Sequence, residues 1–97
     1  MSLPERHRRK LRQLGHALKP VVLVGGQGLH DALLAELDAT LAHHELVKVR
    51  VSAGERSERD AMIATLCSAC AAELVQRVGH VALLYRRHPD KPRIKLD

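Results

Sequence analysis

Aromatic side chains are almost absent from this sequence of 97 residues. It contains no tryptophan and no phenylalanine, and its single tyrosine is Tyr85. Protein surfaces that bind single strands by base stacking use several Phe, Tyr or Trp side chains, so a stacking platform of that kind is excluded. We interpret Tyr85 as a half-buried strand residue that stacks at most one base. Since 45% of the residues are hydrophobic, the core must be aliphatic.

Cysteine and long apolar runs are scarce as well. Cys67 and Cys70 stand close together in one predicted helix, which is no disulfide framework and favours a reducing, cytoplasmic location. Their C-x-x-C spacing has no second pair and no H-x₃₋₅-H to complete a zinc site, so we interpret both as packing residues and expect no metal and no cofactor.

No apolar run reaches the roughly 18 residues of a membrane span. Residues 1–19 have the composition of a mitochondrial presequence, but no cleavage-like break separates them from the domain.

Positive charge is concentrated in the two ends of the sequence. Residues 1–19 carry six Lys and Arg against one acid, and residues 77–97 carry six against two. The segment between them carries four against eight. Such segregation favours an anionic polymer as the partner. The alternative is a pair of solvated basic ends without a common function.

A first helix is predicted before residue 20. Ser2 is its expected N-cap, Pro4 suits its first turn, and Pro20 prevents its continuation. Its apolar stripe consists of Leu3, His7, Leu11, Leu14 and Leu18. Its opposite, basic face consists of Arg6, Arg9, Arg12 and Gln13.

Strands are predicted from short β-branched runs. The run at 21–24 is apolar throughout and is expected to be buried on both faces. The run at 46–51 alternates with a period of two, which places Lys48 and Arg50 on its polar face. Two further strands flank Gly79-His80, a two-residue hairpin signal.

Two more helices complete the pattern. The second has an apolar stripe of Leu29, Leu33, Leu34, Leu37 and Leu41. The third begins with Ser57 as its cap and has a stripe of Met62, Ile63, Leu66, Cys67, Cys70 and Leu74. A short edge strand is expected at 94–96. The order α-β-α-β-α-β-β predicts a single α/β domain over 1–97, with a four-stranded mixed sheet and packed helices.

Three glycines follow the first predicted strand. The G-x-x-G loop consists of Gly25, Gly26, Gln27 and Gly28. It is not a dinucleotide fingerprint, because Asp31 stands where the third glycine belongs, and it is not a Walker A loop, because Leu29-His30 replaces Lys-Ser/Thr. Two interpretations remain. Either the backbone amides approach a sugar-phosphate chain, helped by the following helix N-terminus, or the loop is only a tight turn.

The sequence resembles the YhbY family, the stand-alone bacterial form of the CRM (chloroplast RNA splicing and ribosome maturation) domain. The matching stretches are HALKPVVLVGGQGL, HHELVKVRV and GHVALLYRR, in this order along nearly the whole chain. The resemblance implies a fold similar to the C-terminal domain of bacterial translation initiation factor three. It also implies RNA binding through the loop, association with the precursor of the large ribosomal subunit, and no enzymatic activity.

The charged residues around the loop complete this prediction. Many relatives carry Lys within the loop and Thr after it, where this chain has Gly26 and His30, so affinity is expected to depend more on the first helix. The predicted RNA-binding residues are the G-x-x-G loop with Arg6, Arg9, Lys10, Arg12, Lys19, Lys48, Arg50 and Arg86. For Arg86 and Arg87, a phosphate contact and a solvated strand end remain equally open. The partner is expected to be structured rRNA, bound by a monomer through phosphates and shape.

Other functions remain as alternatives. The protein is alternatively an adaptor that binds ribosomal proteins on the assembling ribosome, or an intron-RNA splicing cofactor. Larger CRM proteins act in splicing, but with domains that are absent here. A nucleotide-dependent enzyme is disfavoured, because a phosphate-binding lysine, metal-binding carboxylates and an aromatic pocket are missing.

Overall fold

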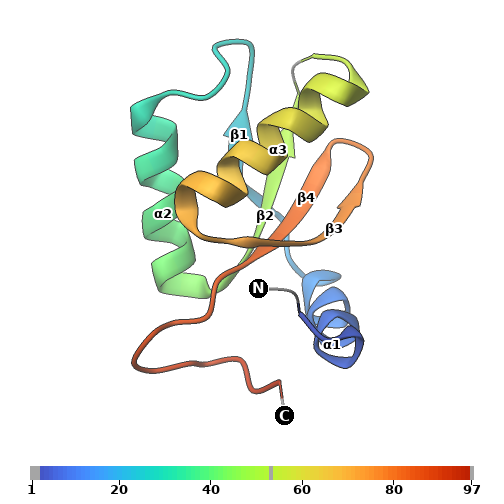
Figure 1. The fold of residues 1–97 in the computed structure, drawn as a ribbon, viewed down its shortest axis with the longest axis vertical. Helices are drawn as coiled ribbons and strands as arrows, with labels where there is room; N and C mark the ends of the chain where they lie inside the picture. Colours follow the sequence, from blue (N-terminus) through green and yellow to red (C-terminus); the bar gives the residue numbers. More distant parts are fainter. Residues whose placement is uncertain (1–2, 53, 97) are drawn as a thin grey trace.

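The computed structural model describes residues 3–52 and 54–96, and it confirms the predicted order of elements (Figure 1). The elements are α1 (Glu5–Gly15), β1 (Pro20–Val24), α2 (Asp31–His44), β2 (Leu46–Val51), α3 (Arg56–Cys70), β3 (Glu73–Val78) and β4 (Val81–Tyr85). The strand order is β1-β2-β4-β3. Because β1 is parallel to β2 and the other pairs are antiparallel, the sheet is mixed, as predicted.

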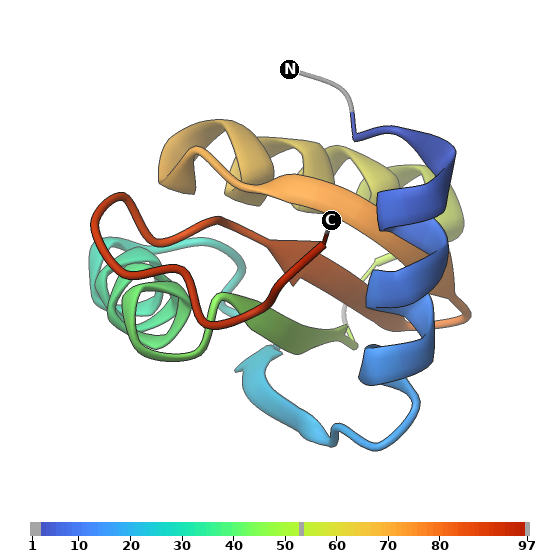
Figure 2. The ribbon, with the colours of Figure 1, turned by 90° about the horizontal axis from the view of Figure 1, so that it is seen from below.

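The sheet lies between two layers (Figure 2). Helices α2 and α3 cover one face, and α1 with the C-terminal tail, residues 86–96, covers part of the other. The period of two in β2 explains this arrangement, since its valines point to α2 and α3 while Leu46, Lys48 and Arg50 lie on the α1 face. No helix in the described ranges is long and apolar enough to cross a membrane.

The first helix is shorter than predicted, and its apolar stripe is partly wrong. It ends at Gly15, and Leu14 and Leu18 are 42% and 37% exposed. Gly15 is buried instead, and a Cβ there would lie 2.6 Å from Cδ2 of Leu83. The helix therefore makes its close approach to the sheet at the glycine, which turns Leu14 to solvent. The predicted cap, Ser2, lies outside the described residues.

Strand β1 is half-buried, which corrects the prediction of a strand buried on both faces. Val22 and Val24 are buried under α2, whereas Val21 and Leu23 are 57% and 65% exposed. The reason is its place at the sheet edge, where the layer over the α1 face does not cover these two side chains.

The bounds of α3 differ from the prediction at both ends. Ser57 is not the cap, because Glu55 takes the N-cap position and forms a capping box with Glu58. The helix ends at Cys70, after which Ala71 adopts a left-handed conformation with φ of 52°. Leu74 therefore belongs to β3 and not to the helix.

The predicted edge strand at 94–96 is also wrong. Over the residues that the structure describes, no strand follows β4. The backbone N–H of Ile94 donates instead to the carboxylate of Glu45, so this segment is held by a side chain and not by a strand ladder.

Candidate nucleic-acid interface

The G-x-x-G loop is a tight turn at one end of the sheet, between β1 and α2 (Figure 1). The backbone N–H of Gly28 donates to the carbonyl oxygen of Gly25 at 3.0 Å, which closes the turn. Gly28 has a φ of +70°, a conformation that strains any residue with a Cβ. The fold itself therefore accounts for glycine at position 28.

The other two glycines of the loop are not required by the fold. Gly25 and Gly26 both lie outside the positive-φ region. A Cβ added to either one would meet no atom of the described residues within 4 Å. Their effect is to leave open space directly above an exposed stretch of backbone, where another molecule can approach the amide groups.

The N-terminus of α2, which follows this turn, is a weaker anion-binding site than the sequence predicts. The His30 ring caps α2, since its Nδ1 accepts from the backbone N–H of Leu33 at 3.3 Å. Asp31 adds a negative charge to the first helical turn. The His30 ring already accepts one of the N–H groups at the helix N-terminus, and the Asp31 carboxylate already opposes the helix dipole there. The helix N-terminus beside the loop is therefore less open to an anion than predicted.

Three of the predicted cations lie on or beside β1 and β2, the two strands that lead toward the glycine turn. Arg50 pairs in register with Leu23 and is exposed, with no hydrogen bond or ion pair to the described residues. Lys19 is likewise exposed and without such a partner. Lys48 is half-buried and donates to the carbonyl oxygen of Leu18 at 3.1 Å. Lys19 and Arg50 therefore keep their donors for an external ligand.

Helix α1 lies away from the glycine turn, in the opposite half of the long axis, along which the molecule measures 38 Å (Figure 1). Arg9 is exposed and makes no hydrogen bond or ion pair to the described residues, and Arg6 is also exposed. Arg12 pairs with Glu5 at 2.7 Å, and Lys10 donates to the carbonyl oxygen of Lys95. The predicted site residues thus form two groups, the glycine turn and the cations of α1, and Lys19 and Arg50 lie between these groups.

Arg86 is held within the fold. Its guanidinium donates to the Asp38 carboxylate at 2.6 Å, to the Asp38 carbonyl oxygen at 2.9 Å and to the Cys70 carbonyl oxygen at 2.9 Å. These bonds join the end of β4 to α2 and α3. Its contact with RNA stays a prediction.

Sequence reasoning missed the role of Glu45, which is only 1% exposed. Its carboxylate accepts the backbone N–H groups of His88 at 2.8 Å, Arg93 at 2.7 Å and Ile94 at 2.9 Å. Burial raises the pKa of Glu45, but these three hydrogen bonds outweigh it, so the pKa lies below its ordinary value. The only signal in the sequence is an acid directly after a helix, which predicts no burial.

Glu45 thereby places the tail beside α1. The Arg93 guanidinium donates to the carbonyl oxygen of His43 at 2.8 Å, and Lys10 reaches Lys95 from α1. We define the basic end as the exposed cations of α1 and the tail. They are Arg6, Arg9, Lys10, Arg87, Lys91, Arg93 and Lys95. Helix α1 and the tail, which carry most of the cations of the two basic segments, are therefore in contact through Lys10 and Lys95.

The cysteines are packing residues, as predicted. Cys70 is buried in the core between the sheet and α2 and α3, and Cys67 packs against it. Burial raises the pKa of both thiols, which keeps them protonated. Within the described ranges, no three His, Cys, Asp or Glu side chains are grouped so that they could hold a metal ion.

Comparison with known proteins agrees with this fold. Residues 3–86 match the family model of the CRS1/YhbY (CRM) domain. A Pseudomonas aeruginosa protein named as a probable RNA-binding protein is 41% identical over 89 residues, which are 92% of this chain and 86% of that protein. A Haemophilus influenzae protein named as an RNA-binding protein is 39% identical over 85 residues, 88% of this chain and 86% of its own. The solution structure of a Staphylococcus aureus protein matches with a TM-score of 0.83 and 30% identity, over 99% of this chain and 100% of that one.

Proposed function

This chain belongs to the CRS1/YhbY (CRM) domain family, and we propose that it binds ribosomal RNA of the precursor large ribosomal subunit and assists its assembly. The names of its relatives support RNA as the partner. The ribosomal part of the proposal extends the family resemblance of the sequence. In this proposal the protein acts as a cytoplasmic monomer without a cofactor, and it stabilises a folded RNA instead of catalysing a reaction.

The observation that carries the proposal is the open glycine turn. Gly25 and Gly26 have neither a strained φ nor a neighbour that excludes a Cβ. A sugar-phosphate chain can therefore come close enough to accept hydrogen bonds from the backbone, in a loop that has no fixed positive charge of its own.

The cations supply the electrostatic part of binding. Arg9, Lys19 and Arg50 are exposed and have no hydrogen bond or ion pair to the described residues. Since they lead from the basic end toward the turn, the proposal requires an RNA that extends along the 38 Å axis of the molecule. A folded RNA meets this requirement better than a short strand, which fits recognition by phosphates and shape.

A protein-binding adaptor on the ribosome is the second candidate, and one observation favours it. Leu14, Leu18 and Val21 are exposed and line a common hollow of about 420 Å³ between the end of α1 and the edge strand β1. Exposed apolar side chains grouped in this way are typical of protein contacts. This candidate predicts affinity for a ribosomal protein and negligible affinity for naked RNA.

The test is fluorescence anisotropy with a folded large-subunit rRNA fragment over a series of salt concentrations. An unrelated structured RNA and a DNA duplex of equal length serve as controls. Tight binding that prefers the rRNA and weakens steeply with salt supports the proposal. Equal and weak binding to all three contradicts it and favours the adaptor.

Replacing Arg9 with Ala tests the basic end. We expect the slope of log K against log salt to decrease by about one, because one phosphate contact is lost. Arg77→Gln is the control, since Arg77 pairs with Asp60 at 2.7 Å and lies away from the proposed interface. An unchanged slope for Arg9→Ala would remove α1 from the interface.

A further inference from the structure

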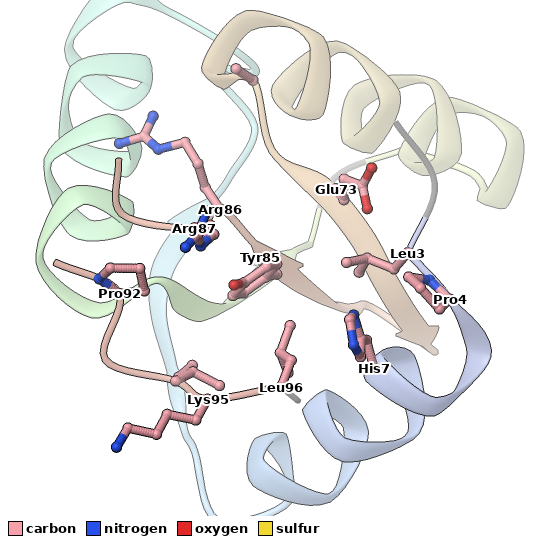
Figure 3. A pocket seen from close by; sticks show the side chains of 12 residues that line it. Leu3, Pro4, His7, Glu73, Tyr85, Arg86, Arg87, Pro92, Lys95 and Leu96 are labelled. Carbon is pink, nitrogen blue, oxygen red and sulfur yellow. The ribbon is translucent and has the colours of Figure 1, made fainter. Parts of the chain in front are cut away.

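A cavity of about 870 Å³ lies between α1 and the tail, on the α1 face of the sheet (Figure 3). Its apolar wall includes Leu3, Ile94 and Leu96, and its floor includes Tyr85, the single aromatic residue of the chain. This volume lies in the range of pockets that hold small organic ligands, about 300–1,000 Å³. The G-x-x-G loop is not part of it.

The charged groups of the cavity stand on separate sides of it. Arg87 lines it and has no hydrogen bond or ion pair to the described residues, whereas the amine of Lys95 points away from the cavity (Figure 3). Figure 3 shows Arg87 and Glu73 on opposite sides of Tyr85. The cavity therefore has a cationic side that suits a phosphate and an apolar wall that suits a flat ring.

Tyr85 contributes a hydrogen-bonding group at the floor. It is 5% exposed, more buried than the half-buried position that the sequence predicts, and its ring packs with Leu11, Leu46 and Leu83. Its hydroxyl makes no hydrogen bond to the described residues. Burial raises the pKa of Tyr85, with a further contribution from Glu45 and opposition from Arg87, so the hydroxyl stays a neutral donor near pH 7.

The wall formed by the tail is fixed in advance. The Glu45 carboxylate holds the N–H groups of Arg93 and Ile94, and Lys10 holds the carbonyl oxygen of Lys95. Arg86 is bonded to Asp38 and Cys70, which fixes the end of β4 below the cavity. A ligand therefore meets walls that are already ordered, which lowers the entropy cost of binding.

We propose that this cavity binds one unpaired nucleotide of the RNA, with its base on the apolar wall, the Tyr85 hydroxyl on the base edge, and its phosphate at Arg87. The inference rests on the proposed function and adds to it a contact with single-stranded RNA at the end opposite the glycine turn. A free nucleotide offers the same chemistry, so the test must separate the two sources.

The test uses the ring resonances of Tyr85, which NMR can follow without ambiguity because the chain has one tyrosine. The full chain is titrated with a short unstructured RNA, a blunt RNA duplex and a nucleoside 5′-monophosphate. We expect the unstructured RNA to shift the Tyr85 resonances, the duplex to leave them in place, and the monophosphate to bind at least about tenfold more weakly, since it lacks the other phosphate contacts.

Two variants and a control locate the contact. Arg87→Ala is expected to weaken binding of the unstructured RNA about tenfold, and Tyr85→Phe about fivefold, because each removes one hydrogen-bonding group while the walls remain. Arg56→Ala is the matched control, since Arg56 is an exposed cation at the start of α3 that also lacks a side-chain partner among the described residues, does not line the cavity and does not belong to the basic end. Its effect should stay below about twofold, as for a single screened surface charge.

The outcomes separate this inference from the proposed function. RNA binding with unchanged Tyr85 resonances overturns the nucleotide site and leaves RNA binding intact. Equal affinity for the monophosphate and the RNA also overturns it, and indicates a small-molecule site. Failure of the unstructured RNA to bind, while the folded rRNA fragment still binds, overturns the nucleotide site and leaves the proposed function intact. Failure of the folded rRNA fragment itself contradicts the proposed function.

Discussion

Replacing Glu45 with Ala is expected to lower the free energy of unfolding by about 3–5 kcal/mol, because a buried carboxylate is removed and the backbone donors that it satisfies are left without an acceptor. Three backbone N–H groups of the tail, those of His88, Arg93 and Ile94, lose their acceptor. The substitution does not change the backbone strain at this position, where φ is 63°, because both residues carry a Cβ. The loss therefore measures the hydrogen bonds and the packing of the side chain.

Urea unfolding followed by circular dichroism measures this effect. Glu36→Ala is the control, since Glu36 is an exposed acid on the same helix that precedes Glu45. We expect the control to stay within about 0.5 kcal/mol of the parent protein. A loss below about 1 kcal/mol for Glu45→Ala would show that the tail is not held by this carboxylate.

The same carboxylate makes stability depend on pH. The pKa of Glu45 is lower in the folded protein than its ordinary value of 4.5. Its contribution is therefore fully present above pH 4.5, and it is lost as the pH falls through the lower folded pKa. Glu5, beside Arg12, also has a lowered pKa, so the parent protein and Glu45→Ala must be compared. We expect the variant to lose less stability on acidification, and parallel curves would contradict the assignment.

Gly26→Asp is expected to weaken binding of structured rRNA at least about tenfold, because it puts a carboxylate where the proposal places a phosphate. The fold should tolerate the change, since φ at Gly26 is not positive and no described atom lies within 4 Å of the added Cβ. Gly28→Asp is less informative, because its φ of +70° strains the folded state of any variant.

Anisotropy titration at one fixed salt concentration measures this loss. Ser68→Asp is the control, as it adds the same charge at an exposed position near the end of α3. It should change the affinity by less than about threefold, the effect of a distant screened charge. If Gly26→Asp and Ser68→Asp bind equally well, the glycine turn has only a structural role.

Local patterns in the sequence were enough to predict the elements and the mixed sheet. The alternation in β2 and the Gly79-His80 hairpin depend on neighbours in sequence, and both are confirmed. Errors arose at the ends and the buried faces of the elements. Glu55 caps α3 through its capping box with Glu58, although serine is the commoner N-cap residue, and Gly15 takes the buried position on α1 beside Leu14.

The arrangement of the candidate site depended on contacts between distant residues. The separation of α1 from the glycine turn follows from how the sheet is covered, which no local pattern encodes. The capture of the tail by Glu45 joins residues more than forty positions apart, the His88 N–H being 43 positions away. The same contacts form the cavity over Tyr85, so no local pattern predicts it.

Contact between RNA and the glycine turn can be tested by an NMR titration of the protein with the folded rRNA fragment, following the backbone amide resonances of Gly25, Gly26 and Gly28. We expect these amides to shift strongly during the titration, together with those of Arg50 and the exposed side of α1. If the RNA saturates the protein while the three glycine amides stay in place, the open turn does not contact RNA and the proposed binding mode is wrong.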